Sequence, residues 1–183
     1  MVGAETLRTL LDYDPASGRL TWRARSADTF PSSTSLRIVR NWNSRFAGQP
    51  AFTTVGANGY RVGNLGGKVL YAHRVVWAWM HGTWPVDEID HLDGDRANNA
   101  WANLRAATPS MNRRNQGRSR RNTSGYTGVT YCQKTDKWVA QMTVGGVCLR
   151  IGKFRCPTAA AVARKQADPQ FGFHKNHGRV AHG

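Results

Sequence analysis

The stretch Glu88-Ile89-Asp90-His91-Leu92-Asp93-Gly94-Asp95 decides the fold of the middle of the chain. Its pattern predicts a short strand that runs into an Asp/Gly turn. The chain then returns into a second strand near Asn103, and Thr108-Pro109 is typical of a helix N-cap followed by proline at the first helical position. Residues 88–117 are therefore predicted to form a strand, a loop, a second strand and a helix.

Four polar side chains of this unit converge if it folds back on itself: Asp90, His91, Asn103 and Asn112. Hydrolysis of a phosphodiester needs a divalent cation and a base that deprotonates water. One carboxylate and one amide oxygen suit Mg²⁺, and a neutral imidazole suits the base. Neighbouring residues of a strand point to opposite faces, so Asp90 and His91 are expected on different sides of a scissile phosphate. An Asp-His dipeptide alone is weak evidence for such a site.

The same residues, together with Asn98-Asn99 and Leu104-Arg105, resemble the HNH endonucleases of phage and homing type, which have the ββα-metal fold. The resemblance covers about residues 60–117. It implies that His91 is the general base, that Asn103 braces the loop through backbone hydrogen bonds, and that Asp90 and Asn112 ligate the metal. With asparagine at the third signature position the motif reads H-N-N, a variant that resembles the monomeric nicking homing enzymes.

The elements before this unit follow from periodicity. Apolar residues at helical spacing predict one helix from Ala72 to Met80, stopped by Gly82. A hairpin is predicted from residues 59–62 and 68–71, and residues 23–50 are predicted to be a long irregular surface loop. His73 and His81 lie off the helix's apolar stripe, where they either line the site or are solvated or core-capping residues, the interpretation that we favour.

Charge identifies the class of partner. The chain has 26 Lys or Arg and 11 Asp or Glu, a formal net charge of +15, and its hydrophobic content of 40% excludes a disordered polycation. Residues 113–183 hold 14 of the basic residues and two of the acidic ones, a balance of +12. Such a density predicts a polyanionic partner. Nucleic acid is favoured over a membrane surface, because the surrounding sequence favours strands rather than an amphipathic helix.

The C-terminal part is predicted to be a three-stranded antiparallel sheet, with strands at 126–133, 138–144 and 147–154, packed on a helix at 159–166. Ser124-Gly125-Tyr126-Thr127-Gly128-Val129, Lys137-Trp138-Val139-Ala140-Gln141 and Gly152-Lys153-Phe154 resemble the AP2 DNA-binding domain. That resemblance implies a sheet that lies in the major groove. The predicted fold class of the whole chain is α+β, a ββα-metal nuclease domain followed by this smaller domain.

Strand alternation predicts which side chains face outward from this sheet, because alternate residues share a face. Gln141 and Arg150 suit base edges, whereas Lys134, Lys137 and Lys153 suit phosphates. The arginines before the sheet are either a merely soluble linker or, as we favour, contacts that follow the phosphate backbone. The predicted DNA-binding residues are Arg113, Arg114, Arg118, Arg120, Arg121, Thr127, Thr130, Lys134, Lys137, Gln141, Thr143, Arg150 and Lys153.

Cysteine content and hydropathy indicate the compartment. Three cysteines without a CxxC pair suit a reducing cytosol and exclude a zinc ribbon, although Cys156 with His174 or His177 remains an alternative metal site. No apolar run approaches the roughly 18 residues of a membrane span. The expected location is therefore the cytoplasm, that of a bacterial host if the chain is phage-encoded.

The predicted domains are an N-terminal extension at 1–58, a nuclease domain at 59–117, a basic linker at 118–124 and an AP2-like domain at 125–183. The predicted function is a site-specific, nicking, homing-type endonuclease that acts as a monomer on double-stranded DNA. We expect Mg²⁺ as cofactor, with Mn²⁺ able to substitute, and neither a membrane nor a small-molecule substrate. The alternatives are a noncatalytic, sequence-specific DNA-binding regulator and a nonspecific defence nuclease.

Overall fold

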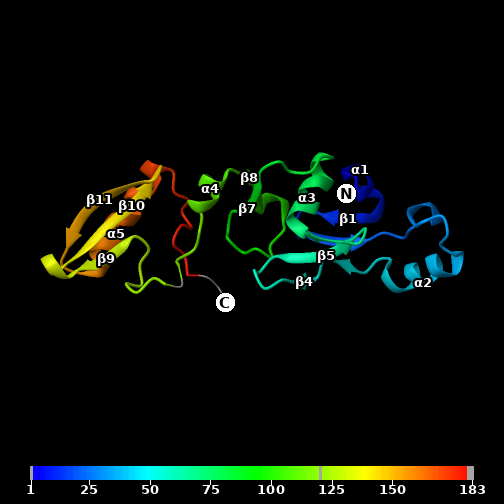
Figure 1. Cartoon of the computed structure of the whole chain (residues 1–183), viewed down its shortest axis with the longest axis horizontal. Helices are drawn as coiled ribbons and strands as arrows, with labels where there is room; N and C mark the ends of the chain where they lie inside the picture. The colour runs from blue at the N-terminus through cyan, green and yellow to red at the C-terminus, as the bar shows by residue number, and fades with distance from the viewer. Residues whose placement is uncertain (1, 120, 181–183) are drawn as a thin grey trace. The chain divides into compact units, whose positions relative to one another are not determined.

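The computed structural model describes residues 2–119 and 121–180. The chain divides into two compact units, unit 1 (Met1–Ala107) and unit 2 (Thr108–Gly183). Both units mix small antiparallel sheets with a few helices, which agrees with the predicted α+β class (Figure 1). Among the described residues, no helix combines the length and apolar character that crossing a bilayer requires.

Unit 1 contains two three-stranded sheets, β1-β2-β3 and β4-β5-β6, and the strand pair β7-β8. Its elements are α1 (Ala4–Leu10), β1 (Leu11–Asp14), β2 (Arg19–Trp22), η1 (Ala27–Thr29), α2 (Leu36–Phe46), β3 (Pro50–Ala51), β4 (Thr54–Val55), β5 (Arg61–Leu65), β6 (Lys68–Tyr71), α3 (Ala72–His81), β7 (Glu88–His91), η2 (Trp101–Asn103) and β8 (Leu104–Ala107).

Helix α3 forms the centre of the unit 1 core. Val75, Val76 and Ala78 are fully buried, and they belong to one cluster with Leu7 and Leu11 of the N-terminal segment. The tryptophans of residues 77–101 pack against this cluster. The helix ends at Gly82, whose φ of 72° is accessible to glycine at low cost, so the predicted helix is confirmed. Residues 1–58, which the sequence separates from the nuclease domain, thus share its core.

The predicted irregular loop at residues 23–50 is wrong in its second half. Residues 36–46 form helix α2, which buries Val39 and half-buries Trp42 and Phe46. Val39, Trp42 and Phe46 do stand at helical spacing, but the prediction followed the polar composition of residues 23–50 rather than this spacing. Contacts of Trp42 with Trp22 and Phe30, from outside the helix, supply the missing stabilisation.

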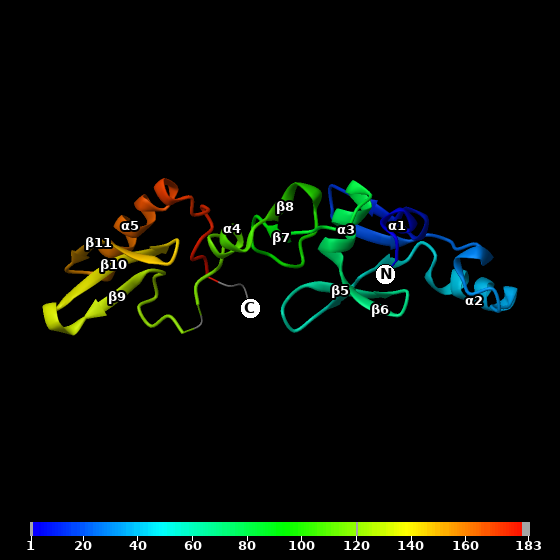
Figure 2. The same cartoon turned by 45° about the horizontal axis from the view of Figure 1, so that its top comes forward.

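Unit 2 contains the predicted three-stranded sheet, in the order β11-β10-β9, and a helix packed on it (Figure 2). Its elements are α4 (Pro109–Arg113), β9 (Val129–Cys132), η3 (Gln133–Thr135), β10 (Lys137–Val144), β11 (Val147–Phe154), α5 (Pro157–Ala167) and η4 (Pro169–Phe171). The Thr108 hydroxyl accepts a hydrogen bond from the Met111 amide, which confirms the predicted N-cap.

The start of the predicted basic linker is held in place within unit 2. The Arg118 amide donates to the Arg179 carbonyl oxygen at 2.7 Å, and the Arg118 guanidinium donates to the Gly125 carbonyl oxygen. The Gly178 amide similarly donates to Gln116 at 2.9 Å. Residues near 116–118 therefore lie beside the C-terminal segment of the same unit rather than forming an unattached connection.

Candidate active site

Strand β7, which pairs with β8, carries two of the four residues that were predicted to do chemistry, Asp90 and His91. In the register of β7 and β8, Asp90 lies opposite Arg105 and His91 lies opposite Leu104. Asp90 is 6% exposed and His91 is 3% exposed. Both side chains are thus held inside unit 1, where hydrogen bonds and ion pairs are less screened than at the surface.

An arginine neutralises the Asp90 carboxylate. Arg105 donates from Nη2 at 2.8 Å and from Nε at 3.1 Å, both to Oδ2 of Asp90. Because the two residues are direct partners across the strands, the pair is fixed by the backbone register as well as by its charges. Arg105 belongs to the residues that carry the family resemblance, but no role was predicted for it, and its place opposite Asp90 is seen only in the strand register.

Asn103 braces the loop between the two strands. Its Oδ1 accepts from the Asp93 amide at 2.9 Å, and its Nδ2 donates at 2.9 Å both to the Asn98 carbonyl oxygen and to Oδ1 of Asp93. Burial raises the pKa of Asp93, but hydrogen bonds from Asn98, Asn103 and the Asp95 amide outweigh it and hold that pKa below its ordinary value. This is the bracing geometry that the resemblance implies for the central asparagine.

Asn99 selects the tautomer of His91. Its Nδ2 donates to the Ala97 carbonyl oxygen at 3.2 Å, which leaves its Oδ1 facing Nε2 of His91 at 3.3 Å. The tautomer with the hydrogen on Nε2 makes this contact a hydrogen bond, and in that tautomer the lone pair lies on Nδ1. The sequence suggested only a turn former at Asn99, and a contact with His91 gives this buried residue a second task.

Burial keeps His91 neutral. It lowers the pKa of the imidazole below its ordinary value of 6.5, and it outweighs the Asn99 hydrogen bond and the nearby carboxylates of Asp93 and Asp90, which act in the opposite direction. A neutral imidazole with a lone pair on Nδ1 is the form that can accept a proton from water near pH 7.

The turn between β1 and β2 supports the segment that carries Asn99. The Tyr13 hydroxyl donates to the Asn99 carbonyl oxygen at 2.8 Å, and the Trp101 amide donates to Pro15 at 2.9 Å. A Cβ atom added to Gly18 would lie 2.3 Å from the backbone of Asn99 and of Ala100, so only glycine allows this approach. The N-terminal segment therefore helps to position His91, which no local sequence pattern indicated.

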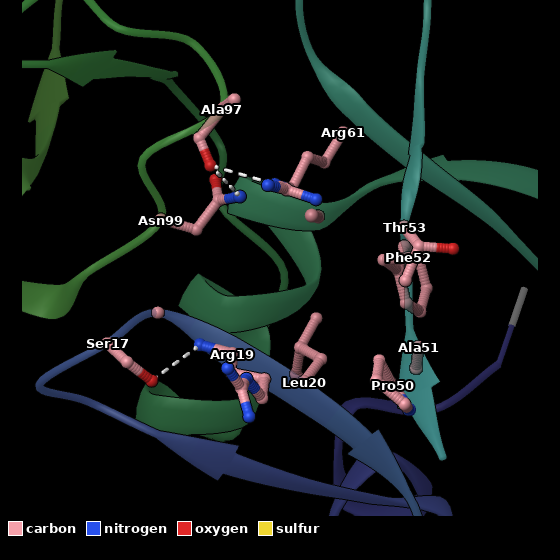
Figure 3. A pocket seen from close by; sticks show the side chains of 12 residues that line it. Ser17, Arg19, Leu20, Pro50, Ala51, Phe52, Thr53, Arg61, Ala97 and Asn99 are labelled. Atoms are coloured by element: carbon pink, nitrogen blue, oxygen red, sulfur yellow. Dashed lines mark hydrogen bonds between the residues drawn. The ribbon is translucent and has the colours of Figure 1, made fainter.

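A cavity of about 390 Å³ adjoins this support, and Asn99 forms part of its wall (Figure 3). Arg61 reaches across it and donates from Nε to the Ala97 carbonyl oxygen at 3.1 Å, the same oxygen that accepts from Asn99. Arg19 lies on another wall of the cavity, beside Ser17. Asn99 thus both lines the cavity and contacts His91.

His73 lies beside His91 rather than in solvent. The two ring centroids are 5.2 Å apart in an edge-on arrangement, and Tyr60 and Tyr71 stand against His73 at 4.8 and 5.6 Å. His73 is 7% exposed and its Nδ1 has no hydrogen-bond partner. Burial, followed by the charges of His91 and Arg74, lowers the pKa of His73 to about 3, so this imidazole stays neutral. His81 instead contacts Trp77 and Trp101.

Five of the residues predicted to read DNA share one face of the unit 2 sheet. Gln141 is paired with Arg150, Thr143 with Cys148, and Val139 with both Thr130 and Lys153. The opposite face carries the buried Val129, Ala140 and Met142, where helix α5 packs. A register shift between Ala140 and Gln141 was not foreseen, and it places Gly152 rather than Ile151 opposite Ala140.

The remaining predicted DNA-binding residues are placed less uniformly. Lys134, Lys137, Arg113 and Arg121 are exposed, Arg114 is half-buried beside Phe173, and Arg120 falls outside the described residues. The prediction that Thr127 contacts DNA is wrong. Its hydroxyl is buried, has no hydrogen-bond partner among the described residues and does not face outward with the others. A Cβ added to Gly178 would lie 2.8 Å from that hydroxyl, so the C-terminal segment covers it.

The donor chemistry of the site fits a hard cation. Asp90 offers a carboxylate, and Mg²⁺ is commonly held by one or two carboxylates while it keeps several waters. In residues 2–119 and 121–180 there is no group of three or more His, Cys, Asp or Glu able to hold a metal. Asn112 lies in unit 2, and its role as a ligand stays a prediction from the resemblance.

Comparisons with known proteins agree with the nuclease resemblance. Residues 70–114 match the family model described as HNH endonuclease, a segment that holds all four predicted nuclease residues. Protein 3.8 of Escherichia phage T7 is 36% identical over 80 residues, which cover 43% of this chain and 66% of that protein. No solved structure matches the chain.

Residues 70–114 thus match the HNH endonuclease family, and the chain is similar to a phage protein. The family match covers less than half of the chain, and the aligned region spans just under two thirds of the phage protein. The comparisons give no support to the AP2 resemblance, although the sheet and helix on which it was built are present. The reading of DNA by unit 2 stays a prediction.

Proposed function

We propose that the protein is a metal-dependent DNA endonuclease in which His91 is the general base. The observation that carries this proposal is the surroundings of His91. Its imidazole is buried and neutral, and its Nε2 faces Oδ1 of Asn99 at 3.3 Å. This arrangement presents Nδ1 as the basic atom, on a strand whose preceding residue is the carboxylate Asp90.

The proposed reaction is hydrolysis of one phosphodiester. Nδ1 of His91 takes a proton from water, the water oxygen attacks phosphorus, and the bond from phosphorus to the leaving sugar oxygen breaks. That oxygen departs with the electron pair and takes a proton from solvent. The chemistry that a bound Mg²⁺ supplies is neutralisation of the charge that develops on the phosphate and on the leaving oxygen. Asp90, oriented by Arg105, is the unit 1 residue that would hold it.

The finer parts of the proposal concern specificity and product. We infer that the outward face of the unit 2 sheet, with Gln141 and Arg150 paired across it, positions the enzyme on its site. One base per chain implies one cut per binding event, so a nicking, homing-type enzyme that works as a monomer is the form we propose. Mg²⁺ is the proposed metal, and Mn²⁺ should replace it because both prefer oxygen ligands.

The test is incubation of the full chain with supercoiled plasmid, with Mg²⁺ or with a chelator. We expect open-circle product before linear product, and none in chelator. His91→Ala should reduce the rate by about 10²- to 10⁴-fold while leaving DNA affinity unchanged, and His81→Ala is the matched histidine control. Cleavage by His91→Ala at the wild-type rate would refute the role of His91. Binding of DNA without cleavage under any metal would instead indicate the noncatalytic regulator.

A further inference from the structure

Contacts between Arg25 and Asn43 hold helix α2 against the rest of unit 1. The Arg25 amide donates to Oδ1 of Asn43 at 2.8 Å, and Nδ2 of Asn43 donates back to the Arg25 carbonyl oxygen at 2.8 Å. The Arg25 guanidinium lies 3.9 Å from the ring centre of Trp42 and 5.1 Å from that of Trp22. These contacts make α2 a docked element with a defined inner face.

The two faces of α2 differ completely in chemistry. Val39, Trp42, Asn43 and Phe46, at helical spacing, turn toward unit 1 and are buried or half-buried. The opposite face carries Arg37, Arg40, Asn41 and Ser44, at positions i, i+3, i+4 and i+7, and all four are exposed. We call these four residues the outer face of α2. The helix contains no acidic residue, and none of its arginines forms an ion pair with a carboxylate among the described residues.

We propose that the outer face of α2 lies in the major groove of duplex DNA and reads base edges there, an inference whose substrate class rests on the proposed function. The guanidinium of an arginine can form two hydrogen bonds with guanine, and the side-chain amide of an asparagine can form two with adenine. The 11 residues of α2 span about 16 Å, and a helix of that kind fits the groove. Arg37 and Arg40 are one turn apart, so they can address neighbouring base pairs.

An anionic membrane is the competing partner for a basic helix, and the apolar residues of α2 argue against it. Leu36 and Ile38 are 61% and 53% exposed. They are two positions apart, so they lie on different sides of the helix and form no common apolar face. An interfacial helix needs one broad apolar face toward the lipid, and the apolar face of α2 is already packed on unit 1.

The location of α2 separates reading from cutting. In both views α2 lies at the end of unit 1 away from β7 and β8, with α1 and α3 between them (Figure 1, Figure 2). A duplex held by α2 would therefore be contacted at base pairs other than those beside the scissile phosphate. Sequence preference from α2 should accordingly be separable from the cleavage step.

The experiment uses the full chain in the presence of chelator, which prevents metal-dependent cleavage, and a pool of random-sequence duplex DNA. Sequences that the wild type retains are selected and their affinities are compared with those of unselected duplex. Arg40→Ala should weaken binding to the selected sequences by roughly 5- to 150-fold, the range of a lost bidentate base contact, and should affect unselected duplex much less. Arg40→Lys keeps the charge but cannot form the bidentate contact, so it should lose much of the same preference for the selected sequences.

Lys68→Ala is the matched control, because it removes one charge from the exposed first residue of β6 in the same unit. The melting temperature of Arg40→Ala should equal that of the wild type, since the side chain is exposed. An equal effect of Arg40→Ala on all sequences would overturn the inference, and so would an effect no larger than that of Lys68→Ala. Binding to phosphatidylserine vesicles that Arg40→Ala abolishes, with DNA affinity unchanged, would overturn it in favour of a membrane.

Failure of this inference and failure of the proposed function have different signatures. If α2 does not read DNA, Arg40→Ala leaves the sequence preference intact while His91→Ala still abolishes plasmid cleavage. If the protein is no nuclease, wild-type protein leaves plasmid intact under every metal while the Arg40→Ala effect on sequence preference persists.

Discussion

Asp90 and Arg105 face each other directly across β7 and β8, and both guanidinium donors reach the same carboxylate oxygen. The pair places a buried negative charge beside the proposed base and compensates it at the same time. Since Asp90 precedes His91 on one strand, any change that moves the carboxylate also changes the surroundings of the base. Arg105 is therefore expected to be a positioning residue rather than a contact to the reacting phosphate.

Arg105→Ala should lower the free energy of unfolding by about 1 to 3 kcal/mol, because it leaves a buried carboxylate without its charged donor. The cleavage rate should fall as well, and Arg105→Lys should restore part of both because it keeps the charge. Urea unfolding and single-turnover cleavage measure the two effects. Wild-type cleavage by a stable Arg105→Ala protein would show that orienting Asp90 is unimportant.

The pH dependence of cleavage follows from His91. Burial lowers the pKa of His91 below 6.5, and only the neutral form accepts a proton. The rate should therefore be independent of pH just above 6.5 and should fall as the pH drops through the lowered pKa. Single-turnover rates on both sides of 6.5 test this. A rate that still rises steeply above pH 6.5 would contradict the neutral, buried base.

His73 should make the protein unstable in acid. Its pKa is about 3 in the folded state and about 6.5 in the unfolded chain, so the unfolded state takes up the proton first as the pH falls. The stability is complete above pH 6.5 and decreases toward pH 3, by up to about 1.4 kcal/mol per pH unit.

His73→Phe removes this titration and keeps an aromatic ring in place. Its free energy of unfolding should fall less steeply with acid than that of the wild type, as urea titrations at matched pH values would show. His73→Gln is the second variant if the larger ring disturbs packing. Equal slopes for wild type and both variants would mean that His73 is not buried as described.

Gly18 and Gly48 allow a matched test of the contact between the β1–β2 turn and the Asn99 backbone. Both have positive φ, 73° and 78°, but a Cβ at Gly18 would meet the Asn99 and Ala100 backbone whereas one at Gly48 meets nothing within 4 Å. Gly48→Ala should cost about 1 kcal/mol of stability, and Gly18→Ala about 2 to 4 kcal/mol. Only Gly18→Ala should also slow plasmid cleavage under conditions in which both variants are folded. Equal cleavage rates would exclude a role of this support in positioning His91.

Arg150 and Lys153 test the sheet face of unit 2. Arg150→Ala should cost about 1 to 3 kcal/mol on the preferred sequence and relax the preference, because a base contact is lost. Lys153→Ala should weaken binding to all sequences alike and reduce the salt slope by about 0.9, as expected for one phosphate contact. Binding isotherms at several salt concentrations distinguish the two. Identical behaviour of the two variants would mean that this face does not read sequence.

The sequence by itself determined the elements that depend on neighbours along the chain. The stripe from Ala72 to Met80, the N-cap at Thr108 and the turn at Gly145-Gly146 each appear in the structure as predicted. The location of the candidate site could also be predicted, because Asp90, His91, Asn103 and Asn112 stand at a spacing that resembles a known motif, and residues 70–114 match that family. In each case the information lies within a few residues or in a fixed spacing.

Only the tertiary structure decided what surrounds those residues. Tyr13 and Asn99 are 86 positions apart, and their hydrogen bond, like the approach of Gly18 to Asn99, exists only after the N-terminal segment has packed on the nuclease residues. The same holds for the docking of α2, because Trp22 and Phe30, which lie outside the helix, contact Trp42 of its inner face. Such contacts depend on which surfaces the whole chain brings together. A local pattern cannot encode them, because the free energy of burial belongs to the pair of surfaces and not to either segment alone.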